Sequence, residues 1–105
     1  MYLLNQPVGY VYFIRNGLGH IKIGITTNVK KRLDALQTAS PTKLEYFFGM
    51  KVETIDDAAD IEKELHNKFK QHRLCGEWFE ESDVIKWLRQ NKLSVGGYIF
   101  DGVNW

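Results

Sequence analysis

The sequence has little of what stabilises secreted or membrane proteins. Its one cysteine, Cys75, cannot form a disulfide within the chain, so a disulfide-stapled scaffold is excluded and a reducing compartment is the simplest interpretation. The longest apolar runs span about five residues, far fewer than the roughly 20 that a membrane-spanning helix needs. Residues 1–8 contain neither the basic nor the long apolar segment of a secretory signal. We therefore expect a cytoplasmic protein with no membrane partner.

Neither sign of charge predominates, because 14 Lys and Arg face 13 Asp and Glu, a formal net charge of +1. The distribution is uneven, however. Residues 1–43 contain six basic side chains and one acid, or +5, whereas residues 44–105 contain eight basic side chains and twelve acids, or −4. Such a division suits a phosphate ligand beside a metal ion. The alternative is that these charges only solvate two surfaces.

Prolines are also few, only two, and no linker, repeat or low-complexity tract interrupts the 105 residues. We therefore expect one domain over residues 1–105. Because 44% of the residues are hydrophobic and 13% aromatic, a proper core is available and disorder is excluded. The spacing of turn residues predicts an α+β domain of two layers, with the element order β-β-α-β-α-α.

The first half of the chain contains clear local signals. Residues 9–15 and 20–26 are rich in β-branched and aromatic side chains, and the Asn and Gly residues between them predict a hairpin. Asn28 is a suitable cap for a helix from Val29 to about Thr38. In residues 43–53 the apolar side chains alternate, which predicts a strand with one apolar face containing Leu44, Tyr46, Phe48, Met50 and Val52.

The second half is predicted to be mainly helical. Asp56 and Asp57 open a long helix that runs to about His72, with Ala58, Ile61, Leu65 and Phe69 along one stripe. Residues 77–79 look extended, and a third helix begins at Ser82. The aromatic tail, residues 94–105, is expected either to add a short strand or to dock on the domain.

Two groups of residues are candidates for chemistry. Tyr12, Lys22 and Arg32 bring a hydroxyl and two cations to the first hairpin and helix, and Gly24 would let a substrate backbone approach. Glu62 and His66 share a face of the long helix, and a carboxylate at the edge of the core suits a hard divalent cation. Taken singly, each of these residues also fits an ordinary structural or solvated role.

Five short segments follow one another with a characteristic order and spacing. They are Gly9-Tyr10-Val11-Tyr12, Lys22-Ile23-Gly24-Ile25-Thr26, Asn28 to Leu33, Ile61 to His66, and Arg73 with Gly76-Glu77-Trp78-Phe79. Over about residues 8–80 the chain thereby resembles the GIY-YIG nuclease superfamily. More narrowly, it resembles the phage- and bacterium-borne branch in which the second motif reads KIG. Residues 81–105 lie outside the resemblance.

The resemblance implies a small three-stranded antiparallel sheet flanked by helices. It also implies hydrolysis of phosphodiester bonds in DNA with one Mg²⁺ or Mn²⁺ ion, inside a bacterial or phage-infected cell. Tyr12 corresponds to the tyrosine of the first motif, Arg32 to the catalytic arginine and Glu62 to the metal-binding glutamate. Lys22 stands where the second motif usually has tyrosine. Tyr10 competes with Tyr12 for the first motif, and Tyr12 is preferred because the family tyrosine precedes the second-motif glycine by about a dozen residues.

The expected roles follow from phosphodiester chemistry. Arg32 offers a fork of donors to a phosphate, and Tyr12 would orient or deprotonate the attacking water, with Lys22 nearby or in direct contact with the phosphate. His66 would support the site or relay a proton, whereas Glu77 is either a second site acid or a structural acceptor. The residues expected to contact the DNA backbone are Lys30, Lys31 and Lys43.

Two further function classes remain open. A non-catalytic nucleic-acid-binding module would keep the basic residues of the first helix and tolerate the loss of Glu62. An accessory or dimerisation subunit of a phage or defence complex would use the aromatic tail as its interface.

Overall fold

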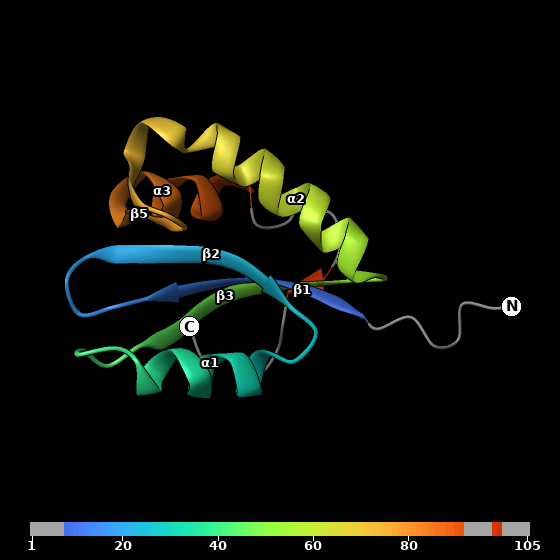
Figure 1. The fold of residues 1–105 in the computed structure, drawn as a ribbon. Coiled ribbons are helices and arrows are strands. Elements are labelled where there is room, and N and C mark those ends of the chain that lie inside the picture. Colours follow the sequence, from blue (N-terminus) through green and yellow to red (C-terminus); the bar gives the residue numbers. More distant parts are fainter. Residues whose placement is uncertain (1–7, 92–97, 100–105) are drawn as a thin grey trace, which may run out of the picture.

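The computed structural model describes residues 8–91 and 98–99 (Figure 1). It confirms the α+β class: one antiparallel sheet has α1 on one face and α2 with α3 on the other. The elements in chain order are β1 (Gly9–Arg15), β2 (His20–Thr26), α1 (Val29–Thr38), β3 (Glu45–Val52), α2 (Ile55–Lys68), the 3-10 helix η2 (Lys70–His72), β4 (Arg73–Cys75), β5 (Trp78–Glu80), α3 (Glu81–Asn91) and β6 (Tyr98–Ile99).

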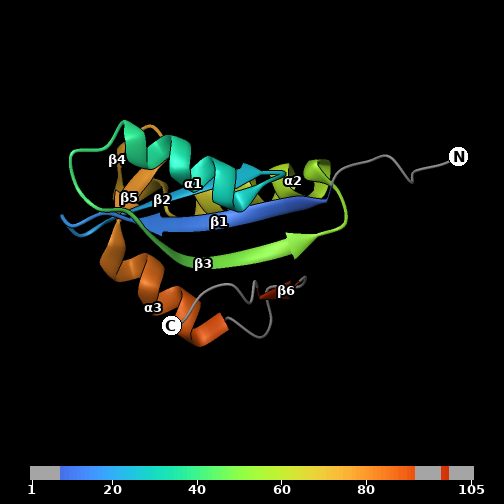
Figure 2. The ribbon, with the colours of Figure 1, turned by 90° about the horizontal axis from the view of Figure 1, so that it is seen from below.

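The sheet is larger than predicted. Its strand order is β4-β5-β2-β1-β3-β6, so the three expected strands form the centre and short strands extend both edges. Figure 2 views the sheet from the α1 side, with β3 beside β1 and β6 beyond β3. The predicted number of three strands is too low because β4, β5 and β6 have only two or three residues each, too few for alternation to identify them as members of the sheet.

Local chemistry explains why the first hairpin and the first helix match their predicted bounds. The Asn16 side chain accepts hydrogen bonds from the backbone N–H groups of Leu18 and His20, and Gly19 has a φ of +83° that favours glycine. Asn28 caps α1 by accepting from the backbone N–H of Lys31, as predicted. The order of β1, β2 and α1 is therefore encoded locally.

The long helix differs from its prediction at both ends. It starts at Ile55, one residue before the predicted opening, and Thr54 caps it by accepting from the backbone N–H of Asp57. Asp56 and Asp57 lie in its first turn, as predicted. It ends at Lys68, and residues 70–72 continue as a 3-10 turn. The predicted apolar stripe does face the sheet, with Ala58, Leu65 and Phe69 buried and Ile61 packed against them. The third helix begins one residue before Ser82.

The prediction of one apolar face for β3 is wrong. Its pairing with β1 shifts register between Phe13 and Ile14, whose partners are Phe48 and Tyr46, so one extra residue forms a bulge. The bulge reverses which face each later side chain occupies. As a result, Phe48 and Met50 face α2, whereas Tyr46 packs with Leu44 in the layer beside α1.

The two layers of the core are unequal. Twelve buried residues fill the space between the sheet and the α2 and α3 helices, among them Phe13, Phe48 and Phe79. On the other face the apolar cluster has three buried members among the described residues, Tyr12, Ile14 and Leu44. The buried Lys22 lies on this face too, and Val29 is the one buried residue of α1. The thin layer therefore leaves room for polar side chains between α1 and the sheet.

Two short segments in the C-terminal part of the chain form strands toward the two edges of the sheet. The expected extension of residues 77–79 corresponds to β5, and β6 gives the tail the short strand that was one of its two predicted forms. The rest of the tail, with the dimer interface predicted there, lies outside the described residues. None of the described helices has the length and hydrophobicity that crossing a membrane requires.

Candidate functional site

Tyr12 lies directly over Gly24. The two residues are cross-strand partners in the β1–β2 hairpin, and Tyr12 is only 1% exposed. A Cβ atom added to Gly24 would overlap the hydroxyl and the ring of Tyr12. The prediction that Gly24 opens a path for a substrate backbone is therefore wrong, because the tyrosine ring fills that space. Gly24 instead fixes where the Tyr12 hydroxyl lies.

This packing predicts that Gly24→Ala destabilises the domain. The added methyl group must displace the Tyr12 ring, and overpacking of this kind costs about 1–3 kcal/mol. Gly17→Ala is the matched control, because its new Cβ would meet only the Cβ of Thr42, at 3.7 Å, an ordinary contact. Urea denaturation of both variants measures the difference. Equal midpoints for the two variants would contradict the close packing of Tyr12 on Gly24.

Arg32 reaches the same hydroxyl from α1. Its Nε donates a hydrogen bond to the Tyr12 Oη at 3.4 Å, and this bond is the main reason that the pKa of Arg32 rises above its ordinary value. The residue itself is exposed to solvent. The guanidinium is thus held at Tyr12 while most of its donors stay available to a ligand.

Lys22 is a buried cation with two partners. Its side chain is 11% exposed, its Nζ lies 2.7 Å from the Glu77 Oε1, and the ring centroid of Trp78 is 5.9 Å from the same nitrogen. The backbone of Glu77 is fixed as well, because its carbonyl accepts a hydrogen bond from the Ile23 N–H. Glu77 therefore acts as an acceptor for Lys22, one of the two roles predicted for it.

Glu62 has a buried carboxylate oxygen. Its side chain is 20% exposed, and its Oε2 has no hydrogen-bond partner among the described residues. Burial, and after it the negative charge of Glu77, raises the pKa of Glu62, while His66 and Lys22 act in the opposite direction. A buried anionic oxygen without a donor is costly unless a cation compensates it.

Both ring nitrogens of His66 are occupied. Its Nε2 lies 2.9 Å from the Ile23 carbonyl, which can only accept, so Nε2 carries the proton. Nδ1 is then the acceptor for the Arg73 Nη2 at 3.5 Å. The Glu62 Oε2 is 4.0 Å from Nε2, beyond hydrogen-bond distance. This arrangement favours support of the site over the proton relay that was its other predicted role.

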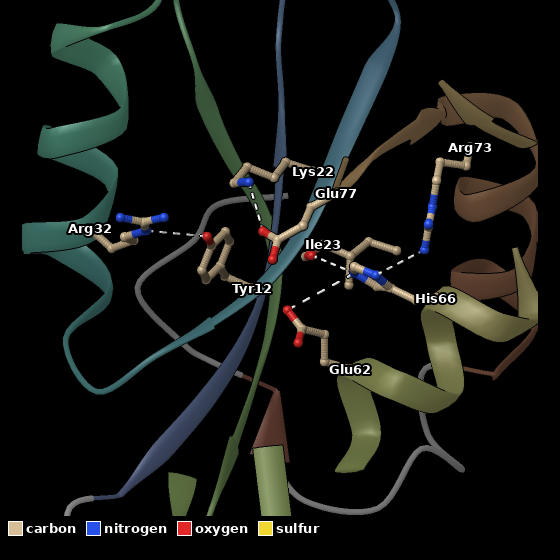
Figure 3. A network of polar contacts seen from close by, with 8 residues as sticks. All are labelled: Tyr12, Lys22, Ile23, Arg32, Glu62, His66, Arg73 and Glu77. Atoms are coloured by element: carbon tan, nitrogen blue, oxygen red, sulfur yellow. Dashed lines mark hydrogen bonds and ion pairs between the residues drawn. The ribbon is translucent and has the colours of Figure 1, made fainter. Parts of the chain in front are cut away.

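The predicted residues meet at the edge of β2 beyond its last pairing with β5 (Figure 3). Tyr12, Arg32 and Lys22 come from the α1 side, whereas Glu62 and His66 come from α2. Glu77 links the two groups, since it bonds to Lys22 and its charge acts on both Glu62 and Arg32. Figure 3 shows this order, from Arg32 at one side to Arg73 at the other.

The three lysines that were predicted to contact the DNA backbone do not lie together. Lys30 and Lys31 are exposed on the first turn of α1 beside Arg32, and Lys30 pairs with Asp34 at 3.6 Å. Lys43 follows the other end of this helix, which is about 15 Å long. The structure therefore keeps Lys43 apart from Arg32.

Sequence reasoning gave no role to Trp78 or Arg73, although both lie in its last matching segment. The position of Trp78 next to the candidate residue Glu77 could have indicated that it lies at the site. The contact between Arg73 and His66 could not be predicted, because it depends on how the chain turns at η2. An open groove of about 710 Å³ was also missed. It is lined by Glu62, Lys63, Glu64, His66, Asn67, Lys70 and Arg73.

Carboxylate and imidazole ligands are too sparse here for a metal site enclosed by protein. Among residues 8–91 and 98–99, no three His, Cys, Asp or Glu side chains form a group that could hold a metal ion. Any divalent cation at Glu62 would therefore keep several waters, as Mg²⁺ does in proteins.

Comparisons with known proteins identify the family. The KilA-N domain-containing protein 315L of Invertebrate iridescent virus 6 is 31% identical over 83 residues, which cover 74% of this chain and 36% of the viral protein. The chain thus spans little more than a third of the length of this relative. No solved structure matches it. Residues 9–92, which include every site residue described above, match the T5orf172 domain, and the chain therefore belongs to the T5orf172 domain family.

Proposed function

We propose that the protein is a metal-dependent endonuclease of the GIY-YIG type that hydrolyses phosphodiester bonds in DNA. The observation that carries the proposal is the meeting of Tyr12, Arg32 and Glu62 at one strand edge, although 50 positions separate Tyr12 from Glu62 in the chain. The resemblance in sequence assigns a hydroxyl, a phosphate-binding cation and a metal ligand to these same three residues. A nucleic-acid module is the coarser form of the same proposal.

The residues present fit a divalent cation. The Glu62 Oε2 has no donor among the residues that the structure describes, and the groove beside it is open to solvent and so leaves room for the waters that Mg²⁺ retains. Glu62 would hold the ion, and Glu77 adds a second negative charge close by. A bound Mg²⁺ would neutralise the negative charge that develops on the phosphate and on the leaving oxygen.

The side chains of the α1 side supply the remaining functions. Arg32 binds the nonbridging phosphate oxygens with the donors that Tyr12 leaves unused, and it stays cationic throughout. Because the Tyr12 Oη accepts from Arg32, its own proton is free to bond to the attacking water and orient it. Ile14 and the partly buried Trp78 pack in the same layer as Tyr12.

Lys22 and Glu77 work as a pair in this proposal. Glu77 compensates the buried ammonium and aims it along the sheet face that also holds Tyr12. Lys22, with its charge balanced by Glu77, then stands in the place where the second motif usually has tyrosine. His66 fixes α2 to the edge of β2, which sets the position of Glu62 one helical turn away.

The decisive experiment is cleavage of supercoiled plasmid by the purified chain. We expect nicked and linear products with Mg²⁺ or Mn²⁺ and none in EDTA. DNA binding in EDTA, measured in parallel, separates the two main function classes. Binding without cleavage under any metal condition would replace the nuclease by the non-catalytic binding module.

A further inference from the structure

Three cationic side chains line the groove beside Glu62. Lys63, Lys70 and Arg73 line it, and none of them forms an ion pair within the part of the chain that the structure describes. Lys30 on α1, by contrast, is already paired with Asp34. Glu64 also lines the groove, so this surface holds one acid besides Glu62 itself.

The cations are arranged along the groove. Lys63 and Asn67 lie four residues apart on α2, and Lys70 follows three residues later at the start of η2. Over the seven residues from Lys63 to Lys70 a helix rises about 10 Å, the distance over which one strand of B-DNA advances about three nucleotides. This spacing suits contacts with phosphates about three nucleotides apart on one strand.

Two contacts hold the Arg73 side chain in place. Its Nη2 contacts the His66 Nδ1, and its guanidinium carbon lies 5.7 Å from the ring centroid of Phe79. Because the side chain is held by an imidazole and an aromatic ring instead of a carboxylate, its charge stays uncompensated. Little side-chain entropy is then lost when it binds a phosphate.

We propose that this groove binds the sugar-phosphate backbone of the DNA on the side of the scissile bond away from α1, with Lys63, Lys70 and Arg73 as the phosphate contacts. The inference rests on the proposed function and extends it. The site then lies between two cationic surfaces, the first turn of α1 and the α2 groove. Figure 3 shows Arg32 and Arg73 on opposite sides of the shared residues.

The test is equilibrium binding of a fluorescent DNA duplex of about 20 base pairs in EDTA, at several salt concentrations. Each lost phosphate contact lowers the slope of log affinity against log salt by about 0.9. The variant K63A/K70A changes two exposed side chains and is expected to lower the slope by about 1.8, so its affinity falls most at low salt. Adding Arg73→Ala is expected to lower the slope by about 0.9 more.

Two variants serve as controls. Lys86→Ala removes an exposed cation of α3, outside the groove, and is expected to leave the slope unchanged. Glu64→Gln removes the acid inside the groove and is expected to tighten binding. If K63A/K70A binds as Lys86→Ala does, the groove proposal is wrong even when the parent cleaves plasmid. If the parent never cleaves but the slope falls as stated, the groove proposal stands and the nuclease does not.

Discussion

Glu62→Gln is expected to abolish metal-dependent nicking and, at neutral pH, to make the folded domain more stable. The amide keeps the shape of the side chain but removes the anionic oxygen that would hold the metal ion. Asp60→Asn is the matched control, because Asp60 is an exposed acid on the same helix. Plasmid nicking and urea denaturation of both variants give the two readouts. Unchanged nicking by Glu62→Gln would contradict its role as the metal ligand.

The gain in stability has a defined pH dependence. Burial and the charge of Glu77 raise the pKa of Glu62 in the folded chain above its unfolded value, so ionisation works against folding. This penalty is absent below the unfolded pKa and complete above the folded pKa. The stability gap between Glu62→Gln and the parent should therefore widen as pH rises from about 4 to about 8. A gap that narrows over this range would show that the carboxylate is stabilised by folding.

Arg32→Ala is expected to reduce the cleavage step by about 10³ or more while DNA affinity in EDTA falls little. An interaction made mainly in the transition state lowers the rate and not the binding of the substrate. Arg32 is exposed, and within the described part of the chain its side chain makes one hydrogen bond, the long one to Tyr12, so the domain should stay folded. Single-turnover cleavage at saturating protein measures the step.

Lys31→Ala is the comparison for this experiment. Lys31 is an exposed cation next in sequence to Arg32, so its loss should weaken binding and the salt dependence without slowing cleavage at saturation. The opposite pattern is informative as well. If Arg32→Ala loses affinity in proportion to Lys31→Ala, and the parent shows no cleavage, the binding module is the correct function.

Secondary-structure elements that are determined by residues close in sequence could be predicted from the sequence. The hairpin from residue 9 to residue 26 and the cap at Asn28 need only turn residues, alternation and a side-chain acceptor within a few positions. The bulge in β3 was not predictable in this way, because it is defined by the partner strand. β4 was not predictable either, since its three residues are exposed and are held only by pairing with β5.

In the candidate site, too, features that depend on local spacing were predictable and features that depend on distant contacts were not. The spacing within motifs identified Tyr12, Arg32 and Glu62 as candidates, and the fold brings them to one edge. The role of Gly24 and the partner of Glu77 could not be predicted from the sequence, because each depends on a contact between strands. Lys22 and Glu77 are 55 positions apart, and no local pattern links them.

The unequal layers of the core separate the site into a robust half and a labile half. Glu62 stands on α2, whose Ala58 and Leu65 belong to the cluster of twelve buried residues, whereas Arg32 stands on α1, where Val29 alone is buried. Opening α1 exposes little apolar surface and so costs less free energy than opening α2. Amide hydrogen exchange should therefore be faster in α1, and mild denaturant should release Arg32 from Tyr12 while the carboxylate half of the site stays in place.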